Sequence, residues 1–202
     1  MSLLPLPYPA AARDLALEYQ GPRWTAPHEV QALCHWARHT TGSLMEIGCN
    51  EGRTLRELAL ACPGRSCFGV DYSGDDGGMC PEQRHERPPP GRLGLYARSL
   101  TTVTILDVRS QDLGAALAAA PCLSSAALGF IFIDGNHTLA GVRTDSEMAF
   151  RYFAERGTPG LIAWHDCYDA GPAWVGVRAY LESRPEAIFR IEGTCLAYLR
   201  VG

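Results

Sequence analysis

None of the eight cysteines in this 202-residue chain belongs to a CxxC pair. That spacing is typical of zinc-binding and redox-active sites, so the cysteines indicate neither. Several of them lie inside apolar runs, where a thiol packs as a small hydrophobic side chain. A chain of this length can also form a core without a disulfide scaffold. We therefore expect the cysteines to be reduced and mainly structural.

The chain also lacks an excess of basic residues and any apolar run of membrane-spanning length. Its formal net charge is -4 and its isoelectric point is near 5.8, whereas binding nucleic acid by phosphate neutralisation requires a basic surface. The opening stretch MSLLPLPYPAAARD lacks the charged start and continuous apolar centre of a signal peptide. We expect a soluble cytoplasmic protein that acts on a small molecule and has no nucleic-acid or membrane partner.

Apolar runs of strand length alternate with stretches of helical periodicity along almost the whole chain. This alternation predicts a single-domain α/β fold with a Rossmann-like doubly wound sheet. The sheet is expected to have seven strands and to be mainly parallel, with its C-terminal strand antiparallel. Strands are expected within residues 43–50, 65–73, 101–108, 128–135 and 160–167 and, as a pair, within 187–201. Helices are expected from about Pro27 to just before Gly42, and within 52–62, 110–120, 138–157 and 172–184.

Two of the expected strands end abruptly in acidic and imidazole side chains. The stretch GFIFIDGNHT spans residues 129–138, and LIAWHDCYD spans residues 161–169. In open α/β sheets, ligands bind at the carboxyl ends of the strands, near the point where the strand order reverses. The sequence therefore predicts that these polar side chains lie in a binding cleft.

Residues 73–94 interrupt the alternation with glycine, proline and charged residues that show no helical period. Such a composition is typical of a solvated surface loop. A loop of this length inside a compact domain is also often a lid or a binding loop, and this one follows the second strand on the cleft side. The sequence leaves both interpretations open.

A glycine-containing turn joins the first expected strand to the next helix. Glu46, Gly48 and Gly52 form ExGxxxG, in which glycine lets the backbone approach a ligand and the helix start offers free N–H groups. Asp71 ends the following strand, where a carboxylate can accept hydrogen bonds from two ribose hydroxyls. Taken alone, Asp71 would be better explained as a turn residue or a helix cap, but its position after this turn favours the ribose interpretation. The GxGxxG turn of nicotinamide dehydrogenases is absent.

The order of these motifs over residues 44–181 resembles class I S-adenosylmethionine-dependent methyltransferases. The resemblance is closest to the small metal-dependent O-methyltransferases related to catechol O-methyltransferase and to sugar and macrolide O-methyltransferases. It implies that the ExGxxxG turn wraps the methionine part of S-adenosylmethionine, that Asp71 holds the ribose, and that the ending of VTILDVRSQDL lies beside the adenine. The cofactor-binding residues so implied are Glu46, Gly48, Gly52, Thr54, Asp71, Ser110, Gln111 and Asp134.

The resemblance also implies a divalent metal ion held by Asp134, His165 and Asp166. Three protein ligands leave coordination positions where a substrate oxygen can bind. Carboxylate ligands suit Mg²⁺, the ion we expect, whereas an imidazole shifts the preference toward Mn²⁺, Fe²⁺ or Zn²⁺. The alternative for His165 is that it packs sideways against Trp164.

His137 stands at the position where the catechol enzyme carries its catalytic lysine and where some sugar-methylating relatives carry histidine. With an ordinary pKa of about 6.5, an imidazole can accept a proton at neutral pH, so we expect His137 to be the catalytic base. Its alternative role is to cap or pack the start of the following helix. Tyr168 and Trp174 are the preferred aromatic candidates for a wall of the acceptor pocket.

The leading hypothesis is therefore an S-adenosylmethionine-dependent and metal-dependent O-methyltransferase for a hydroxyl of a small natural product, either phenolic or sugar-bearing. One alternative is a non-heme Fe²⁺ oxygenase that uses Asp134, His137 and His165. Another is a catalytically inactive cofactor-binding protein on the same fold. Residues 1–42 are expected to contribute a helical segment to the cleft and residues 43–202 to form the cofactor-binding domain. A second copy in a homo-oligomer, or the 73–94 loop, would complete the acceptor pocket.

Overall fold

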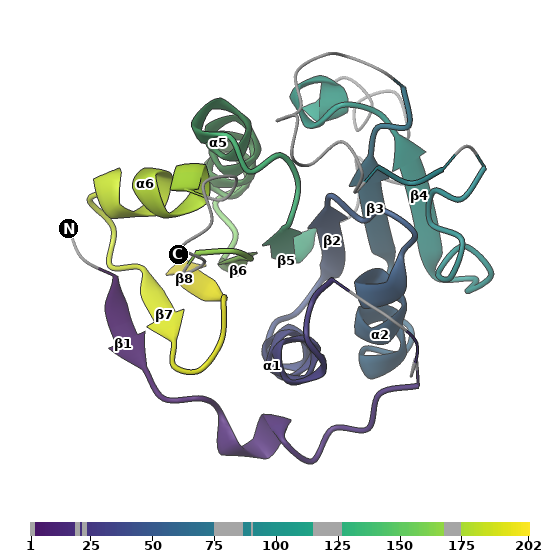
Figure 1. Cartoon of the computed structure of the whole chain (residues 1–202), viewed down its shortest axis with the longest axis horizontal. Helices are drawn as coiled ribbons and strands as arrows, with labels where there is room; N and C mark the ends of the chain where they lie inside the picture. The colour runs from purple at the N-terminus through teal and green to yellow at the C-terminus, as the bar shows by residue number, and fades with distance from the viewer. Residues whose placement is uncertain are drawn as a thin grey trace.

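An eight-stranded sheet runs through the middle of the molecule, with the strand order β1-β7-β8-β6-β5-β2-β3-β4 (Figure 1). The computed structural model describes residues 3–18, 21, 24–74, 87–89, 91–114, 127–167 and 175–202. The strands are β1 (Leu4–Leu6), β2 (Ser43–Ile47), β3 (Cys67–Asp71), β4 (Val103–Asp107), β5 (Leu128–Ile133), β6 (Gly160–Trp164), β7 (Phe189–Ile191) and β8 (Ala197–Val201).

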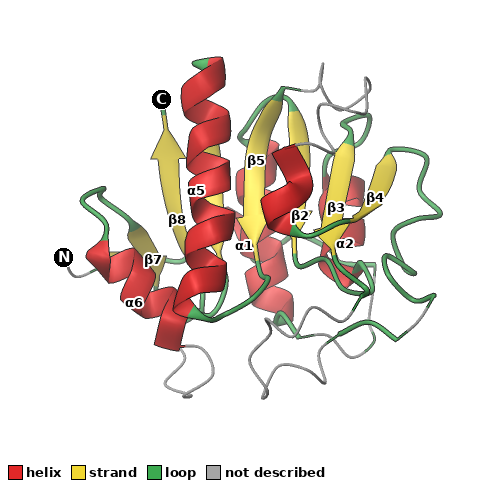
Figure 2. Cartoon of the chain, turned by 90° about the horizontal axis from the view of Figure 1, so that it is seen from above, coloured by secondary structure: helices red, strands yellow, loops and turns green. Residues whose placement is uncertain are grey.

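The predicted α/β fold with a mainly parallel sheet is confirmed. Among the described strands, β8 alone runs antiparallel to its neighbours, β6 and β7, as its opposite direction to β5 in Figure 2 illustrates. The sheet has one strand more than the seven predicted, because β1 pairs in parallel with β7 at the edge. This strand has only three residues and contains Pro5, which is tolerated at a sheet edge. A segment so short carries no alternating pattern from which a strand could be predicted.

Helices cover both faces of the sheet. One face carries α1 (Pro27–Arg38) and α2 (Arg53–Ala61), and the other carries α5 (Leu139–Arg156) and α6 (Val175–Ser183) (Figure 1). Short 3-10 helices lie at Ala10–Ala12 (η1) and Ser110–Asp112 (η3). The helix predicted within 110–120 begins as η3, and its part beyond residue 114 lies outside the described residues. No helix in the described part of the chain is long and apolar enough to cross a membrane.

The two faces of the sheet form two separate apolar clusters. In β5, Ile131 and Ile133 pack in the cluster that includes residues of α5 and α6. Phe130 and Phe132 of the same strand pack in the cluster that includes residues of α1 and α2. Successive side chains of a strand point to opposite faces, so both sets are buried only if helices cover both sides. All six residues of β5 are buried, which explains why its sequence is uniformly apolar.

Local sequence sets where α5 begins and ends. The side chain of Thr138 at the N-cap accepts a hydrogen bond from the Gly141 amide at 3.0 Å, which satisfies one of the free N–H groups of the first turn. Gly157 adopts a left-handed conformation with φ of 59° just beyond the last residue, as is common at helix ends. The helix therefore starts directly after the polar segment that follows β5.

The backbone ladder continues past the ends of the central strands. The Asp134 amide donates to the Ile47 carbonyl at 2.8 Å, and the His165 amide donates to the Ile133 carbonyl at 3.1 Å. Gly48 follows β2 with φ of 86°, and a Cβ at this position would lie 2.1 Å from the Asp134 carbonyl oxygen. Only glycine tolerates both the positive φ and this close approach.

Replacing Gly48 by Ala should therefore destabilise the fold more than the same change at another left-handed glycine. Gly64 has φ of 80°, and a Cβ added there would have no atom within 4 Å, so Gly64→Ala should cost about 1–2 kcal/mol from backbone strain alone. Gly48→Ala should cost about 1–3 kcal/mol more, because the backbone of Asp134 must move. Urea unfolding of both variants measures the difference, and equal losses would contradict the account.

Candidate functional site

A cavity of about 500 Å³ opens at the carboxyl ends of β2, β3, β5 and β6. This is the edge of the sheet where the sequence predicted a binding cleft, and where open α/β sheets bind their ligands. Of the site residues predicted from the sequence, the cavity is lined by Glu46, Gly48, Thr54, Asp71, Ser110, Gln111, Asp134, His137, His165 and Asp166. Gly52 does not line it. Instead, Gly52 is the N-cap of α2 and has φ of 80°. It therefore belongs to the turn without facing the cavity.

Glu46 is buried at 3% exposure in the wall of the cavity. Burial raises the pKa of Glu46 well above its ordinary value, and the negative charges of Asp134 and Asp71 raise it further. Its Oε2 atom is buried and has no hydrogen-bond partner among the described residues. Buried polar atoms normally have a partner. A ligand that brings an N–H or O–H group to this wall would supply one.

Asp71 is held in place by the backbone around it. Its Oδ2 accepts from the Asn50 amide and its Oδ1 accepts from the Tyr72 amide, each at 2.7 Å. Burial raises the pKa of Asp71, and these two hydrogen bonds only partly offset that effect. Each oxygen keeps a further lone pair, so a pair of neighbouring hydroxyls could donate to this carboxylate. Asn50 itself adopts φ of 47°, as the tight turn requires.

Asp145 is a cavity residue that the sequence analysis did not identify. It lies on α5, is 3% exposed, and its carboxylate accepts a hydrogen bond from Ser110. Burial raises the pKa of Asp145 to about 6. The signal available in the sequence was its place on the apolar face of the helix, between the buried residues Val142 and Ala149. A charged residue at such a position is typical of a site that faces a cavity.

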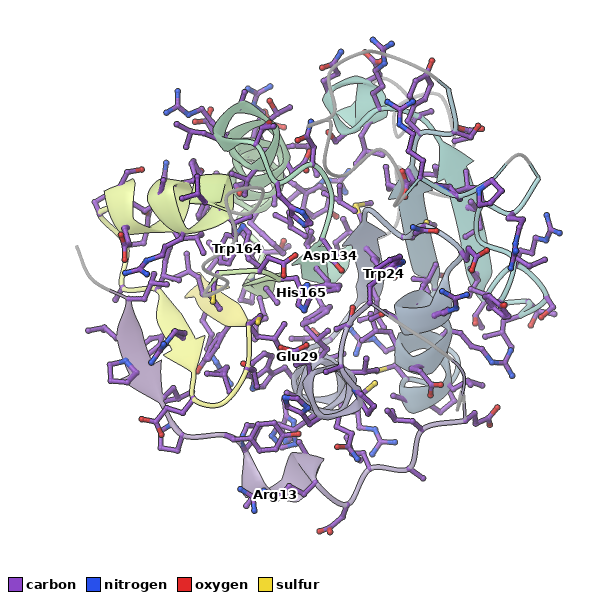
Figure 3. The ribbon with its side chains drawn as sticks, in the orientation of Figure 1. Arg13, Trp24, Glu29, Asp134, Trp164 and His165 are labelled. Atoms are coloured by element: carbon purple, nitrogen blue, oxygen red, sulfur yellow. The ribbon has the colours of Figure 1, made fainter. Side chains whose placement is uncertain are left out.

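The acids and imidazoles that follow β5 and β6 form one cluster, which Figure 3 shows around Asp134 and His165. His165 Nδ1 lies 3.2 Å from Asp134 Oδ1 and 3.2 Å from Asp166 Oδ2. His137 Nε2 lies 3.1 Å from Asp166 Oδ2 and 3.5 Å from Asp134 Oδ1. Both imidazoles therefore face the same pair of carboxylates.

The cluster keeps Asp134 charged despite its burial. Burial alone would raise the pKa of Asp134, but His165 and His137 hold it well below its ordinary value. Burial alone would likewise lower the pKa of His165, but Asp134, Asp166 and Glu29 raise it well above the ordinary value. Opposite charges within hydrogen-bond distance thus outweigh desolvation in this part of the cavity.

The donor set fits a divalent metal ion. Asp134, His137 and Asp166 each bring one ligand atom within 4.8 Å of the other two, and His165 Nδ1 is equally close to both carboxylates. The predicted set of Asp134, His165 and Asp166 is thus brought together, and His137 lies beside it. Asp166 adopts a left-handed φ of 56°, which is unusual for a residue other than glycine. Such strain is common at ligand-binding positions.

Thr25 and Glu29, near the start of α1, contact the cluster and were also missed from the sequence. The Thr25 hydroxyl donates to Asp134 Oδ2 and accepts from the Thr54 hydroxyl, each at 3.4 Å. Glu29 Oε2 lies 3.1 Å from His165 Nε2. Neither residue belongs to a strand end, so the pattern that located the other members of the cluster did not reach them.

The aromatic and loop predictions fall largely outside the described residues. Trp164 is fully buried and donates from its indole N–H to Ser146 Oγ at 2.9 Å, so it is a core residue. Trp24 lines the cavity and is 62% exposed. Tyr168 and Trp174 lie outside the described residues, as does much of the 73–94 loop, although Arg87 and Pro88 of that loop line the cavity.

The strand order, the glycine turn after β2 and the acid that ends β3 define a class I methyltransferase fold. A cofactor-bound protein from MTB, Rv0187, has a TM-score of 0.59 and 16% identity, over 89% of this chain and 82% of its own. A candidate O-methyltransferase from Klebsiella pneumoniae has a TM-score of 0.56 and 17% identity, over 91% of this chain and 82% of its own. At these identities the likeness concerns the fold.

A family model described as a methyltransferase domain matches residues 45–167, which is more than half of the chain. The protein belongs to this family and is a class I S-adenosylmethionine-dependent methyltransferase. No curated protein matches the chain at a significant level. Membership of the family favours methyl transfer over the alternative of an Fe²⁺ oxygenase that uses Asp134, His137 and His165.

Replacing Asp145 by Asn should remove a pH dependence of folding stability. The pKa of this carboxyl rises from 3.8 to about 6 on folding, so the folded state binds the proton more tightly. The resulting stability is complete below about pH 4 and is lost as the pH rises through about 6. Relative to Asp145→Asn, the wild-type protein should lose up to about 3 kcal/mol of unfolding free energy over this range. Urea unfolding at several pH values tests this, and a pH-independent difference would refute it.

Proposed function

We propose that this methyltransferase transfers the methyl group of S-adenosylmethionine to a hydroxyl oxygen of a small molecule, with the help of a divalent metal ion. The observation that supports this most directly is the contact between two parts of the site. The glycine turn after β2 belongs to the part that would hold the cofactor, here called the cofactor half, and the acid and imidazole cluster is the part that would hold the metal ion, here called the metal half. Gly48 of the glycine turn packs against the backbone of Asp134, whose side chain belongs to the acid and imidazole cluster. A methyl donor at the turn and an acceptor oxygen at the cluster would be neighbours, as in-line transfer requires.

The cofactor half of the site offers a partner for each part of S-adenosylmethionine. Asp71 would accept from the two ribose hydroxyls, since both of its oxygens keep a free lone pair. The unpartnered Oε2 of Glu46 would accept from the ammonium group of the methionine part. Ser110, Gln111 and Thr54 also line the cavity. Ser110 and Gln111 would contact the adenine, and Thr54 would contact the carboxylate of the methionine part.

The metal half of the site would use Asp134, Asp166 and the Nδ1 atom of His165. A bound divalent ion lowers the pKa of a ligated hydroxyl and fixes its oxygen for attack. Two carboxylates and one imidazole suit Mn²⁺, Fe²⁺ or Zn²⁺ as well as the Mg²⁺ expected from the sequence. Nδ1 of His165 lies 3.2 Å from an oxygen of each carboxylate, which supports its role as a ligand. Nε2 of His137 lies within 3.5 Å of the same two oxygens, so His137 is the other imidazole that could complete the set.

His137 is proposed to accept the proton of the acceptor hydroxyl. The chain contains no lysine, since all 18 of its basic residues are arginine, and arginine remains protonated at neutral pH. His137 and His165 are the only histidines among the described residues that line the cavity. The Nε2 of His137 lies 3.1 Å from Asp166 Oδ2, and that carboxylate would stabilise the imidazolium formed by proton transfer.

The acceptor is proposed to be a phenol or a sugar-bearing molecule. Trp24 lines the cavity and exposes 62% of its surface, which offers a flat apolar face to an aromatic or sugar ring. Thr25 and His137 line the same cavity. A ring that stacks on the indole could therefore direct one of its hydroxyls toward the cluster.

Replacing His137 by Ala should reduce methyl transfer without weakening cofactor binding. Removal of a general base typically lowers kcat by about 10²–10⁴, whereas S-adenosylmethionine would contact other residues. Transfer of labelled methyl groups to a panel of catechols and glycosides measures turnover, and calorimetry with S-adenosylmethionine measures affinity.

Asp71→Ala is the complementary variant, because it should lose cofactor affinity while leaving the acid and imidazole cluster intact. The proposal is wrong if the wild-type protein binds no S-adenosylmethionine. The role of His137 is wrong if His137→Ala turns over at the wild-type rate.

A further inference from the structure

Glu29 is a buried carboxylate that reaches the metal half of the site from outside the sheet. It lies in the first turn of α1 and is 4% exposed. Its side chain approaches His165 from the side opposite to Asp134, as Figure 3 shows. Glu29 does not line the cavity, so neither cofactor nor acceptor would touch it. Any effect of Glu29 on the chemistry must therefore pass through another residue.

Three hydrogen bonds fix the carboxylate of Glu29. Its Oε2 accepts from the Ala26 amide at 3.0 Å, and its Oε1 accepts from the Cys195 amide at 2.6 Å. The third contact joins Oε2 to Nε2 of His165 at 3.1 Å. Because the two backbone amides belong to different segments, the carboxylate is held between α1 and the turn before β8. A carboxylate fixed in this way is a rigid acceptor for the imidazole.

The contact with Glu29 determines which nitrogen of His165 faces the two acids. An ionised carboxylate only accepts hydrogen bonds, so Nε2 of His165 carries a proton. The remaining nitrogen, Nδ1, lies 3.2 Å from Asp134 Oδ1 and 3.2 Å from Asp166 Oδ2. Without a metal ion, Nδ1 also carries a proton, which it donates to the two carboxylates. A divalent ion bound between them would displace that proton, and Nδ1 would then offer its lone pair to the ion while Nε2 stays protonated.

We propose that Glu29 is a positioning residue for the metal site: it fixes the tautomer and orientation of His165 so that Nδ1 is a metal ligand. This inference rests on the proposed function, because it assumes that a divalent ion binds between Asp134 and Asp166. Carboxylates that accept from the second nitrogen of a ligating histidine orient the ring and increase its basicity. Glu29 accepts from the second ring nitrogen of His165 in this way, although the two residues are far apart in the sequence.

A purely structural role for Glu29 makes a different prediction. Ala26 occupies the N-cap of α1 and has no side chain that can cap it, so the bond from Glu29 to the Ala26 amide could explain the acid by itself. A structural role alone would change folding stability and leave metal affinity unaltered. The two roles therefore differ in a measurable property other than catalytic activity.

The test compares Glu29→Gln with wild-type protein by titration with Mn²⁺ alone. The amide keeps the size of the side chain and one acceptor oxygen, but it removes the charge. Loss of such a partner typically weakens metal binding by about 10–100-fold, and we expect a loss in this range with unchanged affinity for S-adenosylmethionine. Glu57→Gln is the matched control, because Glu57 is also buried, at 3% exposure, and accepts from a backbone amide, that of Glu18, away from the cavity.

The pathway through His165 is tested by a double variant. If Glu29 acts only through this imidazole, Glu29→Gln should weaken Mn²⁺ binding much less in a His165→Asn background than in the wild type. Equal losses in both backgrounds, or a loss in Glu57→Gln as large as that in Glu29→Gln, would overturn the inference.

A measurement on the wild-type protein avoids dependence on the folding of any variant. The ¹⁵N shifts of the His165 ring in Zn²⁺-loaded protein should show a protonated Nε2 and a metal-bound Nδ1. Ligation through Nε2, or no ligation of His165, would overturn the inference. If either of these results were found and the protein still transferred a methyl group to an acceptor, the role of Glu29 would be wrong but the proposed reaction would be supported. Absence of both metal binding and methyl transfer would remove the proposed function as well.

Discussion

The site depends on the hydrogen bonds that continue the parallel ladder beyond the ends of the central strands. The Asp134 amide donates to the Ile47 carbonyl, and the His165 amide donates to the Ile133 carbonyl. These bonds bring the residues after three neighbouring strands to one edge of the sheet. Side chains that are distant in the sequence thereby meet, and Gly48 allows the glycine turn to approach the same edge without a steric clash.

The electrostatics divide this edge into two regions. Where imidazoles face the acid directly, as at Asp134, charge pairing outweighs burial and the pKa of the acid is lowered. Where the imidazoles have only a minor influence, as at Glu46 and Asp145, burial dominates and the pKa is raised. One cavity therefore contains a region where an acid is held in its charged form and a region where burial makes the carboxyls weaker acids.

The sequence predicted most of the fold because the strands carry uniform apolar runs and the turns carry glycine and threonine signals. It predicted the strand-end residues of the site, such as Asp134 and His165, because parallel strands end at one edge. It did not predict β1, which is too short to show a pattern. It also missed Thr25 and Glu29, because their contacts with the cluster come from tertiary packing of α1 and not from a strand end.

The most direct test of the account is anomalous diffraction at the manganese edge from crystals grown with Mn²⁺ and S-adenosylhomocysteine. The account predicts one strong peak between the carboxylates of Asp134 and Asp166, in contact with an imidazole, together with a ribose bound at Asp71. The account would be contradicted if no peak appeared there while the two carboxylates pointed apart, or if the ligand occupied a different part of the molecule.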